Sequence, residues 1–296
     1  MASSAAPFPV LVHPYDSPTR HACAYELATS TSTTARHAVV FIGGLSDGPH
    51  TVPYVRTIAG RMASAADVGP ARAYSVFELR MASSFDSYGF KRLSDDVADL
   101  AALVRYLRSG LGRDKIVFVG HSTGCQDCMA YAASVRAGKS PAVDGYVLQG
   151  PVSDREAFVP HLDPAEYART LAAAERMIAA GQENDLMRRE DLPAMIDSPH
   201  TAGDDDYFST DLPDARLAAS WSCFDKPVLV LPSEQDEHVP ASIDVVKNMA
   251  RWKTFCAPGV LSNLSGLIPG ASHSVEQPEA QLWMADRVIA FLASLE

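Results

Sequence analysis

The 296-residue chain is poor in cysteine, in long apolar runs and in positive charge. Its five cysteines are too thinly spread for a disulfide scaffold, so we expect a reduced, cytosolic protein. No apolar run approaches the roughly 20 residues that a membrane helix needs, and we expect no membrane partner. The first residues lack a basic segment followed by a long apolar one, so we expect no secretory signal. The net charge of −11 argues against a nucleic-acid partner, because phosphate binding needs a basic face.

The excess negative charge is concentrated in one segment. Residues 151–222 contain 15 acidic residues, six arginines and no lysine, which gives a net charge of −9. The rest of the chain carries only −2. This segment is therefore expected to have a role different from that of the surrounding sequence.

Apolar segments alternate with amphipathic ones on both sides of that acidic segment. The pattern predicts strands at 9–14, 21–29, 37–45, 71–79, 115–120, 143–150, 226–232 and 265–270. It predicts helices at 51–63, 93–107, 123–135, 241–252 and 278–295. Such alternation is typical of an α/β fold, with a mostly parallel central sheet that helices cover on both faces. We expect one domain, 1–296, with residues 151–222 inserted as an acidic helical lid after the sixth strand.

The sequence Gly-His-Ser-Thr-Gly at 120–124 stands at the junction of a predicted strand and a predicted helix. This context is typical of a serine nucleophile on a tight, strained turn. Gly120 and Gly124 would let the strand and the helix pass each other closely. A glycine turn that happens to contain a serine is the alternative interpretation. We predict that Ser122 is the nucleophile.

A serine nucleophile needs a base to remove its proton. Two of the nine histidines lie beyond the predicted strand 226–232, and these are His238 and His273. His273 lies in a loop after the predicted strand 265–270, where the active-site loops of a parallel sheet gather. We therefore predict His273 as the base and interpret His238 as a surface loop residue.

The base in turn needs an acid that fixes its tautomer. Asp236 comes just after the strand 226–232, and a carboxylate there can reach the next loop. Glu234 and Glu237 are alternatives in the same acidic turn. We predict Asp236, because Glu234 lies closer to the end of the strand and Glu237 would need a different loop twist; a solvated acidic turn is the other interpretation. The chain order Ser122, Asp236, His273 is the order of the α/β-hydrolase fold.

Two backbone N–H groups are expected to stabilise the oxyanion of an acyl-transfer reaction. Thr123 directly follows the predicted nucleophile, and Leu45 follows the pair of glycines at the end of the predicted strand 37–45. A nucleotide phosphate loop is a poor alternative for the segment Gly-Gly-Leu-Ser-Asp-Gly, which lacks the required lysine and glycine spacing. Cys125 and Cys128 are interpreted as small buried residues rather than as a redox or zinc pair.

The segments FIGGLSDG, GHSTGCQD, GPVSDRE and GDDDYFS together carry a resemblance to a known family. The chain resembles the α/β-hydrolase superfamily and, within it, the fungal and plant family that contains the fusarinine C esterases. The similarity extends over about residues 37 to 280, and GHSTGCQD is its most specific part. Gly43 is a departure, because broader lipases and esterases often have a histidine at this position.

The resemblance implies a cytosolic serine hydrolase that cleaves esters of ornithine-derived hydroxamate siderophores to release iron. It implies a triad of Ser122, Asp236 and His273. We expect no cofactor and no metal. The substrates carry free amines, which a segment of net charge −9 would attract, and the alternative interpretation is that these acidic residues only form a solvated face. Four residues are predicted to contact substrate: Tyr88, Asp204, Asp205 and Asp206. A packed loop aromatic is an equal alternative for Tyr88.

Two other functions fit the same features. One is a lactonase or general carboxylesterase of secondary metabolism, acting through the same triad. The other is a ligand receptor on a hydrolase scaffold, against which the complete triad argues.

Overall fold

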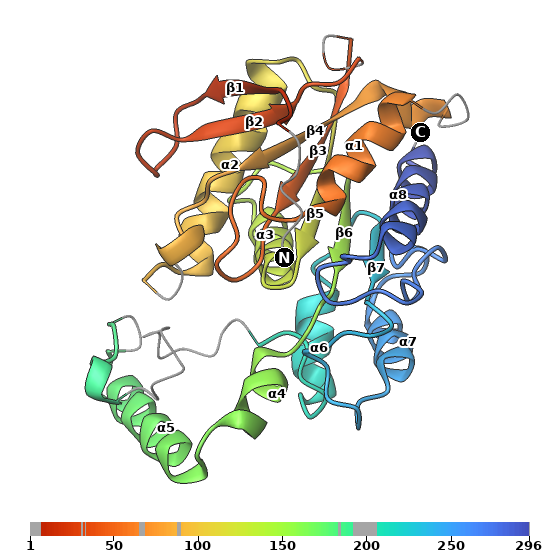
Figure 1. The fold of residues 1–296 in the computed structure, drawn as a ribbon. Coiled ribbons are helices and arrows are strands. Elements are labelled where there is room, and N and C mark those ends of the chain that lie inside the picture. Colours follow the sequence, from red (N-terminus) through yellow and green to blue (C-terminus); the bar gives the residue numbers. More distant parts are fainter. Residues whose placement is uncertain are drawn as a thin grey trace.

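The computed structural model describes residues 7–30, 32, 34–64, 69–87, 90–182, 185–191 and 206–295. These residues form a seven-stranded sheet with helices on both sides (Figure 1). The strands are β1 (Val10–Pro14), β2 (Cys23–Leu27), β3 (His37–Ile42), β4 (Tyr74–Leu79), β5 (Lys115–His121), β6 (Gly145–Gln149) and β7 (Val228–Leu231). The spatial order is β1-β2-β4-β3-β5-β6-β7. The five strands from β4 to β7 in this order are parallel, and β2 runs antiparallel to both of its neighbours, β4 and β1.

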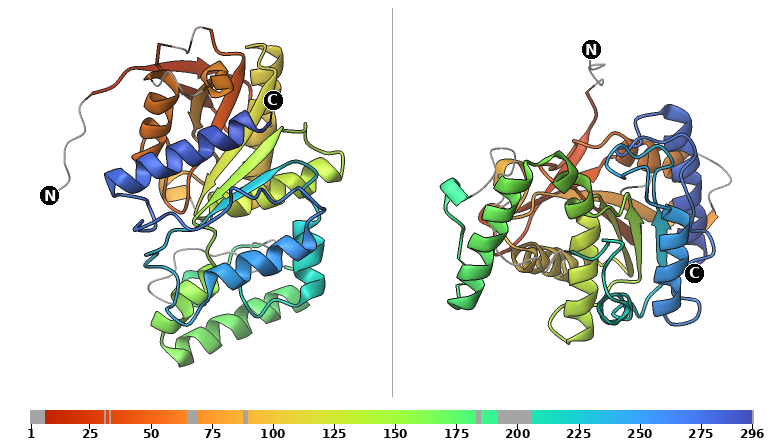
Figure 2. Two further views of the ribbon diagram at one scale, coloured as in Figure 1. Left: turned by 90° about the vertical axis from the view of Figure 1, so that its right-hand side faces the viewer. Right: turned by 90° about the horizontal axis from the view of Figure 1, so that it is seen from below.

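Both faces of the sheet are buried under helices, as the sequence pattern predicts. Helices α1 (Tyr54–Ser64) and α8 (Pro278–Ala293) cover one face, and α2 (Leu93–Ser109) and α3 (Gly124–Arg136) cover the other (Figures 1 and 2). Successive strand side chains point to opposite faces. Val40 therefore packs in the core beneath α2 and α3, whereas its neighbour Val39 packs in the core beneath α1 and α8. None of the described helices is long and apolar enough to cross a membrane.

Along the chain, the inserted segment comes after β6 and before β7. Its described helices lie beyond the carboxyl ends of the parallel strands (Figure 1). It contains α4 (Asp154–Phe158), α5 (Pro164–Ala179) and α6 (Asp214–Trp221). Asp163 caps α5 by accepting hydrogen bonds from the next turn, and Gly181 follows the helix with a φ of 71°. Trp221 stacks on Trp252 of α7 (Val245–Phe255) at 5.0 Å between ring centroids. The carboxyl-terminal end of the insertion is thereby packed against the main body of the fold.

One predicted strand is wrong. Residues 265–270 do not form a strand but a loop, with one isolated bridge between Ser233 and Ile268. The physical reason lies in the sequence of the segment itself. Gly270 adopts a φ of 63°, and the proline before it has no N–H to extend a ladder. The loop nevertheless runs beside the end of β7, where it leads to His273.

Candidate active site

Ser122 occupies a sharp turn between β5 and α3. Its φ of 52° lies in the left-handed region, which a residue with a side chain adopts only when its surroundings impose it. A Cβ built on Gly120 would lie 2.4 Å from the carbonyl oxygen of Gly124, and one on Gly124 would lie 2.3 Å from that of Ile42. Only glycine fits at these two positions. The strand and helix can therefore pass closely enough to hold Ser122 at the apex.

The loop after β3 lies against this turn. A Cβ built on Gly44 would lie 2.7 Å from the Cβ of Ser122, so the backbone of this loop directly adjoins Ser122. Asp47 fixes the loop, because its Oδ2 accepts a 2.9 Å hydrogen bond from the Gly44 N–H. Its own N–H donates to the Gly44 carbonyl at 3.0 Å. Sequence reasoning missed Asp47, although an aspartate three residues after a glycine pair is a recognisable turn signal.

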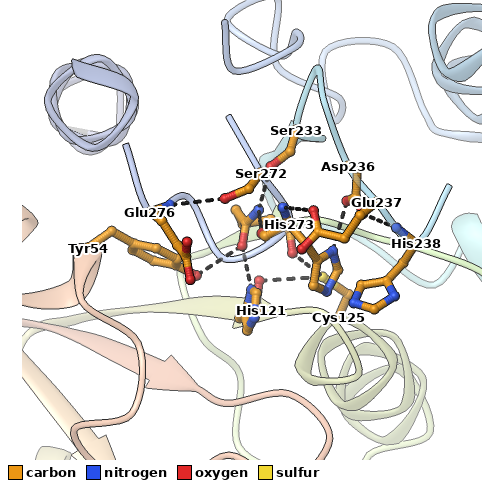
Figure 3. Close-up of polar contacts among 12 residues, drawn as sticks. Tyr54, His121, Cys125, Ser233, Asp236, Glu237, His238, Ser272, His273 and Glu276 are labelled. Atoms are coloured by element: carbon orange, nitrogen blue, oxygen red, sulfur yellow. Dashed lines mark hydrogen bonds and ion pairs between the residues drawn. The ribbon is translucent and has the colours of Figure 1, made fainter. Parts of the chain in front are cut away.

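Asp236 and His273 form a buried pair. The Nδ1 of His273 lies 2.8 Å from the Oδ2 of Asp236, and both side chains are less than a tenth exposed. The other carboxylate oxygen, Oδ1, accepts from the His238 N–H at 3.0 Å. Both oxygens of the carboxylate are thus engaged, and the imidazole is held by the one that faces it (Figure 3).

The two glutamates near Asp236 have other partners. Glu234 Oε2 accepts a 2.7 Å hydrogen bond from the Gly270 N–H. Glu237 Oε2 accepts a 2.8 Å hydrogen bond from the backbone N–H of His273 (Figure 3). Both therefore support the loop that carries the histidine, whereas Asp236 is the acid that contacts the imidazole.

Ser122 and His273 line one cavity of about 220 Å³, together with Leu45 and Thr123. The other lining residues are Asp47, His121, Val152, Asp154, Ala157, His238 and Ser274. His238 is exposed, as predicted for a loop residue, yet its ring lies edge-on to that of His273 with centroids 4.6 Å apart. The structure thus gathers the predicted nucleophile, base and oxyanion donors around one space.

Leu45 and Thr123 are the predicted oxyanion donors and lie on the same cavity as Ser122. Within the described part of the chain, neither N–H donates a hydrogen bond to a protein acceptor. Two free N–H groups at such a place are suited to an oxyanion.

Asp154, at the start of α4, is a cavity carboxylate that sequence reasoning missed. Its Oδ2 accepts a 2.6 Å hydrogen bond from the side-chain amide of Gln126. Burial, helped by the nearby Asp206 carboxylate, raises the pKa of Asp154, while His273 and His238 oppose that rise. No lysine or arginine is among the described residues that line the cavity. The only sequence signal was the position of Asp154 just after a buried strand.

His121 precedes the nucleophile and is almost completely buried. Its ring centroid lies 5.1 Å from that of His273. Burial, together with His273, lowers the pKa of His121 to about 4. His121 is therefore neutral near pH 7 and adds no positive charge to the cavity.

The four residues predicted to contact substrate are not among the described residues that line the cavity. Tyr88, Asp204 and Asp205 lie outside the described residues. Asp206 is described and does not line the cavity; its carboxylate accepts from Ser209 and pairs with Arg155 at 3.4 Å. Its role in substrate binding stays a prediction.

Cys125 and Cys128 are fully buried under the sheet, as predicted. Burial raises the pKa of both thiols well above the usual value. A buried thiol of raised pKa is unreactive, so these residues fill space beside the nucleophile turn.

Known proteins resemble the chain over nearly its whole length. The UPF0613 protein PB24D3.06c of Schizosaccharomyces pombe is 31% identical, and the match covers 98% of each chain. The fusarinine C esterase sidJ of Aspergillus fumigatus is 26% identical over 90% of this chain and 92% of the relative.

Solved structures place the chain among α/β-hydrolase folds. The siderophore hydrolase EstB from Aspergillus fumigatus has a TM-score of 0.76 at 24% identity, covering 99% of both chains. An α/β-hydrolase fold protein of unknown function has a TM-score of 0.65 at 16% identity, covering 99% of this chain and 97% of that one. The family described as "Protein of unknown function (DUF1749)" matches residues 1–293, so the chain belongs to the DUF1749 family.

Proposed function

We propose that the protein is a serine hydrolase that cleaves carboxylic esters through an acyl-serine intermediate. The observation that carries this proposal is the buried Asp236–His273 pair, at 2.8 Å, on the cavity that also contains Ser122. The relatives named esterase and siderophore hydrolase support the same reaction class.

Each proposed role follows from the geometry. His273 takes the proton of Ser122 as Oγ attacks the ester carbonyl, and it then gives that proton to the leaving alcohol. Asp236 keeps the proton of His273 on Nδ1, so that Nε2 is free to act as the base. The N–H groups of Leu45 and Thr123 stabilise the oxyanion. Water, activated by the same histidine, then releases the acid and restores Ser122. No step of this cycle requires a metal or a cofactor.

The proposed substrate is an ester of a fusarinine-type hydroxamate siderophore, hydrolysed in the cytosol. The names of sidJ and EstB support this class of substrate. The charge of the cavity supports a cationic ester, because Asp154 faces the reaction space and the described lining holds no lysine or arginine. A bound ammonium group would favour the charged form of Asp154, which burial disfavours. The acidic segment 151–222 would attract the same substrate over a longer range and act as a lid.

A substrate panel tests the proposal. The panel contains a fusarinine-type ester, its N-acetylated counterpart, a p-nitrophenyl ester and a lactone. We expect the highest kcat/KM for the amine-bearing ester and a fall of that value from low to high salt, since the screening length shrinks from about 10 Å at 0.1 M to about 3 Å at 1 M. Preference for the lactone or the neutral ester would instead support a lactonase or a general carboxylesterase.

The variant Asp154→Asn isolates the cavity charge. It should lower kcat/KM for the amine-bearing ester about tenfold and leave the p-nitrophenyl ester unaffected. Asp16→Asn is the matched control, because this exposed aspartate loses the same charge but does not line the cavity. Equal effects of the two variants would contradict the proposal that Asp154 favours a cationic substrate. The proposal that the protein hydrolyses esters would not be affected.

A further inference from the structure

Gln149 is the last residue of β6 and is completely buried. It lies between β5, where it pairs with His121, and β7, where it pairs with Leu231. Its main-chain carbonyl accepts a 3.0 Å hydrogen bond from the backbone N–H of Ser122. The backbone of the nucleophile is therefore tied directly to this residue.

The side-chain amide of Gln149 bonds four other groups. Its Nε2 donates to the main-chain carbonyl of His273 at 3.1 Å and to the Ser233 hydroxyl at 3.2 Å. Its Oε1 accepts from the Tyr54 hydroxyl at 3.1 Å and from Nδ1 of His121. These four partners converge from separate parts of the chain (Figure 3). The same residue thus contacts the backbone of both the nucleophile and the base.

The chemistry of these partners fixes the direction of the amide. A main-chain carbonyl can only accept, so the NH₂ group of Gln149 must face His273. The amide oxygen then faces His121, whose Nδ1 must carry the hydrogen. Both N–H donors and both lone pairs of the amide are consequently used. A buried amide whose donors and acceptors are all hydrogen-bonded has a single favoured orientation. Its hydrogen bonds then restrain the positions of the groups that it contacts.

We propose that Gln149 is a positioning residue that sets the separation between the nucleophile Ser122 and the base His273. The inference rests on the proposed hydrolase reaction. His273 lies on a loop without regular secondary structure, so its carbonyl needs an anchor to keep the imidazole aimed at the serine. Misplacing a catalytic group by about 1 Å can cost about 10²-fold in rate.

The variant Gln149→Met tests this role. It keeps the approximate shape and the main-chain bond to Ser122 but removes the donor to the His273 carbonyl and the donor to the Ser233 hydroxyl. We expect kcat to fall by about 10²-fold with KM for the p-nitrophenyl ester within about twofold. The rate constant for reaction with a fluorophosphonate should fall in parallel, while the final labelling still reaches one group per folded chain.

Gln281→Met is the matched control. This change removes two side-chain hydrogen bonds of Gln281, with Thr57 and with the carbonyl of Glu276, where Gln149→Met removes four, but Gln281 lies on α8 and does not line the cavity. Its kcat and labelling rate should stay within about twofold of wild type. Unchanged kcat and labelling rate in Gln149→Met, at whatever melting temperature, would overturn the proposal.

The variant Gln149→Glu gives a pH signature and keeps the test decisive if the methionine variant does not fold. A protonated carboxyl group can donate one hydrogen bond to the His273 carbonyl, and an ionised one can donate none. Burial raises the pKa of such a group, so we expect kcat to fall between about pH 6 and about pH 9 in the variant only.

The titratable neighbours of this position do not produce that fall. Burial raises the pKa of Tyr54 on α1 and of Cys125 on α3 well above the usual values. Burial and the charge of His273 lower the pKa of His121 on β5 to about 4. His273 itself is present in both proteins. An identical pH profile for wild type and variant would contradict the inference.

The outcome for Gln149 is separable from the outcome for the hydrolase. If wild type reacts with the fluorophosphonate and Gln149→Met reacts equally fast, only the positioning role fails. If wild type neither reacts nor cleaves any ester, both proposals fail together.

Discussion

The change Asp236→Asn probes the pair that carries the proposed function. In the structure, one carboxylate oxygen faces the His238 N–H and the other faces Nδ1 of His273. An asparagine has one oxygen and one NH₂ group for these two positions. Placing the oxygen toward His238 satisfies that N–H and turns the NH₂ group toward His273. Nδ1 must then accept, and the hydrogen moves to Nε2, where it blocks the base.

The opposite orientation does not restore the site. It would satisfy His273 but place the NH₂ group against the His238 N–H, two donors at about 3 Å with no acceptor between them. The comparable change in serine proteases lowers kcat by about 10⁴. The expected loss here is the same, which corresponds to about 5 kcal/mol of transition-state stabilisation.

The assay measures kcat for a p-nitrophenyl ester together with the melting temperature of each variant. Glu234→Gln and Glu237→Gln are the controls, because an amide oxygen can still accept the backbone N–H groups that these glutamates bind. Both should keep kcat within about tenfold of wild type. The reasoning is refuted if Asp236→Asn retains more than about a tenth of the activity, or if either glutamine variant is the more damaging change.

Three further predictions follow from individual contacts. Ser122→Ala should abolish turnover but leave the circular dichroism spectrum unchanged, and wild-type rates would exclude Ser122 as nucleophile. Gly44→Ala places a Cβ 2.7 Å from that of Ser122, so the shifted oxyanion loop should lower kcat by about 10²-fold, and an undiminished kcat would contradict this loop geometry. Burial raises the pKa of Asp96 to about 6, so the contribution of this carboxyl group to stability should fall as pH rises from about 4 to about 6. Urea unfolding should then show Asp96→Asn about 3 kcal/mol more stable than wild type above pH 7 and about equal at pH 4, whereas a pH-independent difference would show that the titration of Asp96 does not cause it.

The turn at Ser122 and the mostly parallel α/β fold were predictable because their signals are local. Ser122 is flanked by glycines within two residues on each side, and the strands read as continuous apolar runs. Asp236 was distinguished from its acidic neighbours by its distance from the end of β7, and its contact with His273 agrees with that choice. The strand predicted at 265–270 failed because its apolar residues stand between Gly266 and Gly270, which limit it to a single bridge.

The residues that sequence reasoning missed depend on long-range placement. Gln149 reaches Tyr54 across 95 positions and His273 across 124, so no short pattern reveals that it joins the nucleophile and the base. Asp154 becomes a cavity residue because α4 begins just beyond the end of β6. Asp154 entered the sequence-based prediction only as one of the acidic residues of the segment 151–222. The net charge of a segment does not show which of its carboxylates lines the cavity.

The central claim is that Ser122 is an activated nucleophile, and mass spectrometry of the chain after reaction with a fluorophosphonate tests it most directly. The account predicts one phosphonyl group per chain, located on the peptide that contains Ser122. It also predicts no labelling in Ser122→Ala, and labelling at least about 10²-fold slower in Asp236→Asn. An unlabelled wild-type protein, or a label on a different residue, would contradict the account.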